Sequence, residues 1–382
     1  MSECGMPRND PMTSVPIAPD YGPGSLAAVL PGVAAALGHP TELPAVALEP
    51  ADRVCVVLID GLGHQLLLDN AADAPFLAAM PARSLRAGCP STTATSMASF
   101  GTGLVPGRHG LVGYQVMDPD RGVLLNELKW DPEVEPLRWQ PYRTVFDHLM
   151  SAGIACTAIG NPEFEGSGLT IAALRGPTFV GREKLPDRVN AAVAALAEPG
   201  LVYLYWGQVD AAGHGFGTQS RNWRKALREI DEAIGRLARL LPTGTTLLVI
   251  ADHGMIDAPH HQRVDLAMRP DLQPDIEVLA GEARFAQAYC APGAGPEVAE
   301  RLATAFAGRA WVRTKQQAIE AGWLGPVDDR VLGRVGDVLV AAADAFTFID
   351  SRTAAPSELK LIGQHGSLTD AEQIVPLLQL NL

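Results

Sequence analysis

The stretch RVCVVLIDGLG at residues 53–63 decides the fold class of this chain. Its first seven residues are nearly all apolar and rich in β-branched side chains, which is typical of a strand covered on both faces of a parallel sheet. A carboxylate, Asp60, follows directly, and a helix is expected from about Leu62. The stretch therefore predicts a buried strand that ends in an acidic side chain.

Three more apolar runs of strand length occur at 156–159, at 201–206 (LVYLYW) and at 246–251 (TLLVIA). Helical patterns lie between them, most clearly at 222–241, where apolar residues recur at steps of three and four above a charged face. This alternation predicts an α/β fold with a mostly parallel central sheet between helices. We expect one catalytic domain over residues 1–382. The segment at about 256–350 separates two groups of motifs, so we expect it to form an inserted cap subdomain.

Composition and charge exclude several classes of function. Hydrophobic residues make up 47% and charged residues 19% of the 382 residues, which is ordinary for a globular protein with a large core. The formal net charge of -13 argues against a nucleic-acid-coating surface, because that mode of binding needs fields of Lys and Arg. A small phosphate compound remains a suitable partner, since metal ions can supply local positive charge.

Cysteines and apolar segments indicate a cytoplasmic protein without a membrane span. The mixed charges and prolines of residues 1–24 do not resemble a signal peptide. The apolar run at 26–37 is short and broken by Pro31, so it predicts a core helix, and no segment is long enough to cross a bilayer. Five cysteines lie far apart without a CxxC spacing, which indicates reduced thiols: Cys4, Cys55, Cys89, Cys156 and Cys290.

The segment YWGQVDAAGHGFG at 205–217 follows a predicted strand and contains Asp210 and His214. A spacing of four residues places both side chains on one side of a helical turn, where they can bind one divalent ion. The alternative is an Asp that caps the turn and a solvated His. Taken alone, the two interpretations have about even odds.

The segment ADHGM at 251–255 follows another predicted strand. Asp252 and His253 can reach one metal only if the chain turns sharply at the strand end, and Gly254 permits such a turn. Asp60 ends the first strand in the same way, although it is equally suited to cap a helix. His365 in GQHGS is a single loop histidine, a type of residue that is more often structural.

A cluster of hydroxyl side chains at 91–102 (STTATSMASFGT) precedes or begins a short helical pattern. Free N–H groups at a helix N-terminus favour an anion, and a hydroxyl bound to a metal is able to attack phosphorus. The alternative is a helix cap with redundant hydroxyls. Only the joint occurrence of these motifs favours a two-metal site.

In order and context, these motifs resemble the type I phosphodiesterase/nucleotide pyrophosphatase family of the alkaline phosphatase superfamily. The resemblance extends from the strand before Asp60 to His365 and implies an alkaline-phosphatase-like fold, a hydrolase of phosphoric esters and two zinc ions, although other divalent ions are possible. It implies that one ion is bound by Asp60, Thr93, Asp252 and His253. The other is bound by Asp210, His214 and His365.

The resemblance also implies that Thr93 is the catalytic nucleophile. The family has its nucleophile nine residues before the threonine of a Thr-Gly pair, and counting back from Thr102 leads to Thr93, with Thr92 as the fallback. An asparagine that contacts phosphate in the family corresponds to Ser96 here. Because a serine reaches less far, we also name Asn126 and Lys129 as candidate substrate-binding residues.

Several functions remain open at this point. A phosphodiesterase or nucleotide pyrophosphatase is favoured over a phosphomonoesterase, because no third metal site or phosphate-binding arginine is evident. A phosphonoacetate-type hydrolase and a non-catalytic metal-binding relative are alternatives with the same ligand set. The sequence contains no sulfatase Cys/Ser-x-Pro-x-Arg motif, no GxxxxGK[ST] loop and no GxGxxG-led βαβ unit. The physiological substrate and the oligomeric state are not predicted.

Overall fold

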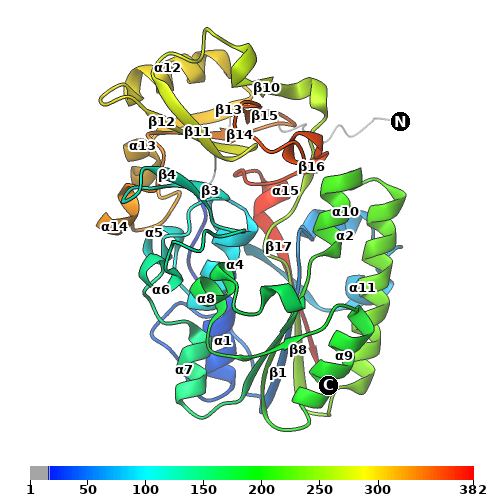
Figure 1. Cartoon of the computed structure of the whole chain (residues 1–382). Helices are drawn as coiled ribbons and strands as arrows, with labels where there is room; N and C mark the ends of the chain where they lie inside the picture. The colour runs from blue at the N-terminus through cyan, green and yellow to red at the C-terminus, as the bar shows by residue number, and fades with distance from the viewer. Residues whose placement is uncertain (1–15, 17) are drawn as a thin grey trace, which may run out of the picture.

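The computed structural model describes residue 16 and residues 18–382, and it is built around one mixed seven-stranded sheet (Figure 1). Cys4 and most of residues 1–24 lie outside the described residues. Across the sheet the strands follow the order β2 (Ala82–Arg86), β17 (Ile374–Asn381), β8 (Thr245–Ile250), β1 (Arg53–Ile59), β7 (Gly200–Trp206), β5 (Cys156–Gly160) and β6 (Thr178–Gly181).

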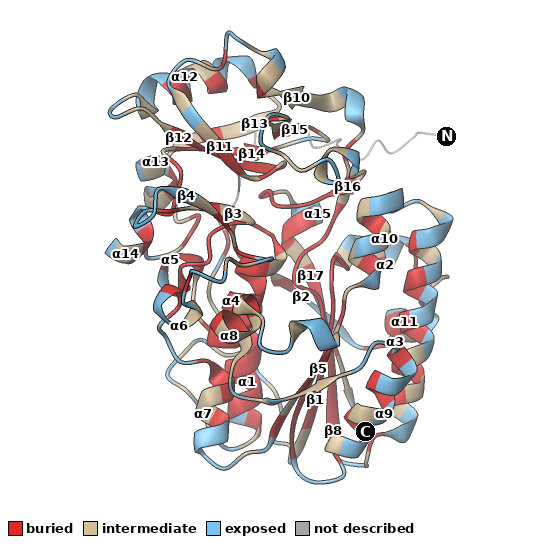
Figure 2. Cartoon of the chain, in the orientation of Figure 1, coloured by how far each residue is buried: buried red, intermediate tan, exposed pale blue. Residues whose placement is uncertain are grey.

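The strand that decides the fold class lies at the middle of this sheet. β1 has the predicted bounds 53–59 and pairs in parallel with both β7 and β8. Residues 54–59 of β1 and all of β8 are buried, so the centre of the sheet forms a red band in Figure 2. Burial on both faces explains why these strands read as continuous apolar runs.

One edge of the sheet departs from the parallel pattern. β17, at the C-terminal end of the chain, runs antiparallel to β8 and to β2. The expectation of a mostly parallel sheet is therefore correct for β8, β1, β7, β5 and β6, and the sheet as a whole is mixed.

Helices cover both faces of the sheet, as the alternating pattern predicts (Figure 1). The first group is α1 (Val29–Ala36), α4 (Thr93–Thr102), α7 (Val145–Ser151) and α8 (Gly168–Leu174). The second group is α2 (His64–Asp69), α3 (Pro75–Ala79), α9 (Leu185–Ala195), α10 (Gln208–Phe216) and α11 (Arg221–Leu240). The amphipathic helix expected at 222–241 is α11, shifted by one residue.

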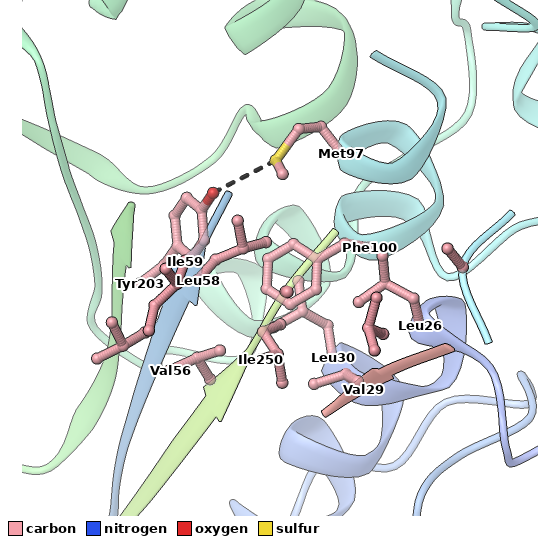
Figure 3. Packing of buried hydrophobic residues seen from close by; sticks show 14 of the residues in the cluster. Leu26, Val29, Leu30, Val56, Leu58, Ile59, Met97, Phe100, Tyr203 and Ile250 are labelled. Atoms are coloured by element: carbon pink, nitrogen blue, oxygen red, sulfur yellow. Dashed lines mark hydrogen bonds between the residues drawn. The ribbon is translucent and has the colours of Figure 1, made fainter. Parts of the chain in front are cut away.

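Apolar side chains of α1 and α4 form the core on the first face (Figure 3). The run at 26–37 is a 3-10 turn, η1 (Leu26–Ala28), that leads into α1. Pro31 does not break this helix, because it lies in the first turn of α1, where its missing N–H has no intrahelical acceptor. Phe100 packs against Tyr203 of β7, whose hydroxyl lies 3.4 Å from the sulfur of Met97.

A second, smaller sheet lies at one end of the molecule and has its own apolar cluster (Figure 1). Its strands are β11 (Ile276–Glu282), β12 (Phe285–Cys290), β14 (Val338–Ala342) and β13 (Ala310–Thr314), all antiparallel, covered by α12 (Gly295–Ala305). These elements fall inside the segment 256–350 for which we expect a cap, and we refer to β11–β14 and α12 as the cap.

Shorter elements connect the sheet and the cap. The paired strands are β3 (Gln115–Asp118) with β4 (Val123–Asn126), β10 (Arg263–Asp265) with β15 (Thr347–Ile349), and β9 (Ile256–Asp257) with β16 (Gly363–Gln364). The short helices are α5 (Pro106–His109), α6 (Pro136–Trp139), α13 (Lys315–Glu320), α14 (Asp329–Leu332) and α15 (Asp370–Gln373), and the 3-10 turns are η2 (Pro162–Phe164), η3 (His260–Gln262), η4 (Leu266–Met268) and η5 (Glu358–Lys360).

Two expectations from composition can be compared with the described part of the chain. Within residues 18–382, no helix combines the length and the apolarity needed to cross a membrane. The four cysteines in this part, Cys55, Cys89, Cys156 and Cys290, are free thiols.

Candidate active site

The carboxyl ends of three adjacent parallel strands bring three carboxylates together. Asp60 follows β1, Asp252 follows β8, and Asp210 lies in the first turn of α10 after β7. Gly61 adopts a φ of 73° directly after Asp60, and its N–H donates to Oδ1 of Asp252 over 3.1 Å. The chain therefore turns sharply at the strand end, and the two neighbouring strand ends are tied to each other. Asp60 does not cap α2, whose N-cap is Gly63.

Three histidines point their Nε2 atoms into the same region. In each ring Nδ1 lies next to a backbone carbonyl: His214 to Gly363 (2.7 Å), His253 to Gly254 (2.9 Å) and His365 to Ser91 (2.9 Å). Because a carbonyl oxygen only accepts, Nδ1 carries the ring proton and Nε2 keeps its lone pair. A second hydrogen bond of this kind is how proteins orient metal-binding histidines.

The first group of site residues surrounds the Nε2 atom of His253. Oδ1 of Asp60 lies 3.4 Å away, Oδ2 of Asp252 lies 3.5 Å away, and the Thr93 hydroxyl lies 3.2 Å away. These are the four residues that the resemblance assigns to one ion. The hydroxyl beside His253 belongs to Thr93 and not to Thr92.

The second group lies beside the first. Nε2 of His214 is 3.4 Å from Oδ2 of Asp210, and Nε2 of His365 is 3.9 Å from Oδ1 of Asp210. The rings of His253 and His365 stack with centroids 3.7 Å apart, so the two groups are in direct contact. Ligand atoms of Asp210 lie within 4.8 Å of Asp60 and His253 as well as of His214 and His365, so this carboxylate belongs to both groups.

The chemistry of this donor set fits two divalent cations. Oδ1 of Asp60, Oδ1 of Asp210 and Oδ2 of Asp252 are buried and accept no hydrogen bond from any described residue. Burial and the neighbouring carboxylates Asp252 and Asp210 raise the pKa of Asp60 well above its usual value. Burial lowers the pKa of His365 well below its usual value, with further lowering by His253 and His214. Cations among these groups would offset both the repulsion and the desolvation.

Tyr205 supports the first group from β7, and the sequence analysis did not identify it. Its hydroxyl donates to Oδ2 of Asp60, which leaves Oδ1 of the same carboxylate free to face His253. The only signal in the sequence is the position of Tyr205 near the end of a predicted strand. A tyrosine in that place is not distinguishable from a packing residue.

Thr93 is the first residue of α4, so three backbone N–H groups at the start of this helix have no intrahelical acceptor. The positive end of the helix dipole is thus directed at the Thr93 hydroxyl and at any anion bound beside it. Thr92 is the N-cap residue, and its side chain makes no capping hydrogen bond.

The three candidate substrate-binding residues occupy different surroundings. Lys129 is exposed and lines the main cavity. Asn126 is half-buried, and its side chain accepts hydrogen bonds from the N–H groups of Leu128 and Lys129, so it stabilises a turn. Ser96 is fully buried within α4 and does not line the cavity. Of the three, only Lys129 is therefore in the cavity with the two groups of candidate metal ligands.

A cavity of about 760 Å³ opens onto both groups. Its apolar wall includes Leu128, Phe164, Leu169, Leu174 and Phe179, and Tyr205 meets the ring of Phe164 edge-on at 5.8 Å between centroids. The cap contributes the other wall, with Leu279 and Glu282 of β11. A cavity of this size, with a partly apolar wall and ionisable groups at one end, is suited to a small organic molecule with a charged or polar group.

Comparisons with known proteins agree with this architecture. The sequence model of the type I phosphodiesterase/nucleotide pyrophosphatase family matches residues 54–368. The bis(5'-adenosyl)-triphosphatase ENPP4 of Bos taurus is 35% identical over 96 residues, which are 24% of this chain and 21% of that protein. The match thus spans about a fifth of the length of that relative.

Solved structures with similar folds share little sequence with this chain. Murine ectonucleotide pyrophosphatase/phosphodiesterase 5 superimposes with a TM-score of 0.69 and 19% identity over 85% of this chain and 87% of that chain. A second structure of the murine protein is an inactive threonine-to-alanine variant in complex with AMP. It superimposes with a TM-score of 0.68 and 18% identity over 85% of this chain and 87% of that chain. Phosphonoacetate hydrolase of Sinorhizobium meliloti 1021, in complex with phosphonoformate, superimposes with a TM-score of 0.66 and 20% identity over 86% of this chain and 90% of that chain. These likenesses establish an alkaline-phosphatase-like α/β fold.

Proposed function

This chain belongs to the type I phosphodiesterase/nucleotide pyrophosphatase family, and we propose that it is a metal-dependent hydrolase of small phosphodiesters. One observation carries the proposal. The Thr93 hydroxyl, at the N-terminus of α4, lies 3.2 Å from Nε2 of His253 inside a cluster of unpaired carboxylates and histidines.

We assign one zinc ion to Asp60, Thr93, Asp252 and His253, and the other to Asp210, His214 and His365. Zinc accepts these oxygen and nitrogen ligands, and the Nδ1 hydrogen bonds fix each histidine in the tautomer that metal binding needs. When bound, the two ions would lower the pKa of a nearby hydroxyl or water and stabilise negative charge that develops around phosphorus.

The residues of the chain then have the following roles. Oγ1 of Thr93 attacks phosphorus and displaces one ester oxygen, which leaves as the alcohol with the proton of the threonine hydroxyl. The phosphoryl group, which keeps its second ester group, is then bound covalently to Thr93. The N–H groups at the start of α4 bind a non-bridging oxygen during this displacement. Water then attacks the same phosphorus, so that the Thr93 hydroxyl is regenerated and a phosphomonoester is released.

The charges in the cavity favour diesters over monoesters. Lys129 and Arg263 are its lysine and arginine side chains, and the Nη1 atom of Arg263 already donates to the carbonyl of Leu359. A monoester dianion would have few cationic partners here, whereas a diester carries a single charge. An inactive variant of the murine relative binds AMP, and the bovine relative is named for a bis-adenosyl triphosphate, so a nucleotide-type diester is the natural first substrate to examine.

The test uses the zinc-loaded protein with bis(p-nitrophenyl) phosphate and p-nitrophenyl phosphate, which share a leaving group. We expect faster hydrolysis of the diester, complete loss after chelation and recovery when zinc is returned. Phosphonoacetate is assayed in parallel. A protein that binds two zinc ions per chain but hydrolyses the monoester or the phosphonate faster than the diester would contradict the proposal, as would one that hydrolyses none of the three.

A further inference from the structure

A hairpin of the cap brings one acidic side chain into the cavity. β11 ends at Glu282 and β12 begins at Phe285, so Glu282 lies at the tip of the hairpin. Glu282 is 8% exposed and lines the 760 Å³ cavity together with Thr92, Thr93 and His365. A β-carbon on Gly366 would lie 3.0 Å from that of Glu282, so the missing side chain at 366 makes room for this approach.

The Glu282 carboxyl has no well-formed partner among the described residues. Both of its oxygens are buried and accept no hydrogen bond that meets ordinary geometry, and no Lys, Arg or His of the described chain forms an ion pair with it. The Thr92 hydroxyl and the Tyr114 N–H are its nearest donors, while Glu127 adds a repelling charge. Burial is the main reason why the pKa of Glu282 rises to about 8. Such a group is costly, because a buried polar atom without a partner loses its hydration.

The structure holds this carboxyl in place instead of letting it turn to water. Two residues further along the hairpin, Arg284 forms a bidentate pair with Glu372 at 2.7 and 2.8 Å, and both side chains are fully buried. Arg284 also donates to the carbonyl oxygens of Ala342 and Phe346. Glu372 in turn accepts from the N–H of Ser367, two residues after His365. The hairpin tip is therefore fixed relative to the metal-ligand loop.

The other acidic residues of the cavity wall, apart from the assigned metal ligands, have partners. Asp350 is paired with Arg352 at 2.6 Å, Glu358 accepts from the Tyr114 hydroxyl at 2.9 Å, and Glu163 is exposed and accepts from Asn161. Among the described residues, Glu282 is therefore the acidic side chain of this wall, outside the candidate metal ligands, whose oxygens lack a partner. A positively charged substituent beside Glu282 would favour its ionised form and pair with it, whereas a negatively charged substituent would be repelled by the same carboxylate.

We propose that Glu282 is a recognition residue for substrate and binds a positively charged amino group carried by one of the two ester groups of the phosphodiester. The inference rests on the proposed phosphodiesterase function. An ammonium group would give the buried oxygens of Glu282 their missing donors, and the Tyr114 ring, which lines the same cavity, offers an aromatic surface that cations favour. Substrates of this class are aminoalkyl phosphodiesters.

Three p-nitrophenyl phosphodiesters of nearly equal size test the proposal. Their second ester group ends in an ammonium (2-aminoethyl), a methyl (propyl) or a carboxylate (carboxymethyl) group. For the zinc-loaded wild-type protein we expect kcat/KM to be about ten-fold or more higher for the 2-aminoethyl than for the propyl ester, which is the gain expected of a charged hydrogen bond. The carboxymethyl ester should be the poorest substrate.

Replacement of Glu282 should abolish the preference for the 2-aminoethyl ester, whereas hydrolysis of the phosphodiester should continue. In Glu282→Gln the 2-aminoethyl and propyl esters should react with similar kcat/KM, and the propyl ester at about the wild-type rate. Glu282→Asp keeps the charge and should keep part of the preference. Glu127→Gln is the matched control, because Glu127 is also a buried glutamate but accepts from Trp139 and Gly113 and does not line the cavity. It should keep the full preference.

The outcomes separate this inference from the function on which it rests. If wild-type protein hydrolyses the propyl ester but shows no preference for the 2-aminoethyl ester, the recognition role is wrong and the phosphodiesterase function stands. If Glu282→Gln slows all three esters equally, or if the carboxymethyl ester is the best wild-type substrate, the residue acts on the phosphoryl group and the proposal is likewise overturned. If no ester is hydrolysed, the proposed function itself fails.

Discussion

The Nε2 atoms of His214 and His365 face each other at 3.2 Å, and both rings carry their proton on Nδ1. Two lone pairs are therefore directed at one another, next to the unpaired Oδ1 of Asp210. No hydrogen bond connects the two nitrogens in these tautomers. A divalent metal ion among the three groups would satisfy all of them at once.

Loss of one ligand should therefore reduce the metal content. We expect about two zinc ions per wild-type chain by elemental analysis after dialysis, and about one for His214→Ala. Asp231→Asn is the control, because Asp231 is also buried but stabilises the start of α3 through the N–H groups of Phe76 and Leu77. It should keep both ions even if it unfolds more readily. Unchanged zinc content in His214→Ala would refute the assignment of this ligand.

The hydrogen bond from Tyr205 should strengthen metal binding without being a ligand. In Tyr205→Phe, Asp60 loses its donor, and we expect zinc affinity, measured by competition with a chromophoric chelator, to fall by about 10- to 100-fold. Tyr203→Phe is the matched change on the same strand. Among the described residues, the Tyr203 hydroxyl forms a hydrogen bond only with the Met97 sulfur. Equal zinc affinities of the two variants would argue against a supporting role for Tyr205.

Much of the main sheet could be predicted from the sequence, because its central strands are buried on both faces and read as unbroken apolar runs. β1 has the expected bounds, and β7 and β8 differ from theirs by one residue. The antiparallel pairing of β17 was not predictable, since pairing depends on contacts with strands more than 100 residues away. The motif residues from Asp60 to His365 do converge. Tyr205 and Glu282 were missed because neither belongs to a local motif, and only the fold brings them to the site.

The ion pair between Arg284 and Glu372 should be one of the strongest single links between the cap and the main sheet. Arg284→Met leaves the Glu372 carboxylate buried without its main partner, and we expect the free energy of unfolding to fall by about 3–5 kcal/mol. The exposed pair Lys225–Glu229 on α11 provides the comparison. Lys225→Met should change stability by less than about 1 kcal/mol. Chemical denaturation measures both, and similar small changes would show that the buried pair contributes little.

His109 should make stability depend on pH below neutrality. Burial, together with Arg330 and Arg334, lowers its pKa to about 3, and the neutral ring donates to Ser99 and accepts from the Leu111 N–H. Since an unfolded histidine binds a proton near pH 6.5, the unfolded state gains protons first as the pH falls. This contribution to stability is complete above pH 6.5 and is lost progressively toward pH 3.

A comparison with His109→Gln isolates that contribution. Between pH 6.5 and pH 4.5 the free energy of unfolding of the wild type should fall more steeply than that of the variant, by up to about 1.4 kcal/mol per pH unit. Denaturant titrations at several pH values measure the difference. Parallel pH profiles for the two proteins would show that His109 does not titrate differently in the folded and unfolded states.

The role of Thr93 as nucleophile is tested by the rate of Thr93→Ala on bis(p-nitrophenyl) phosphate, measured together with its zinc content. Thr92→Ala serves as the control, because the two threonines are adjacent and only Thr93 lies beside His253. We predict that Thr93→Ala retains zinc in the Asp210 group but loses activity by about 10³-fold or more, while Thr92→Ala remains active. Thr93→Ala that hydrolyses the diester at the wild-type rate would contradict this prediction.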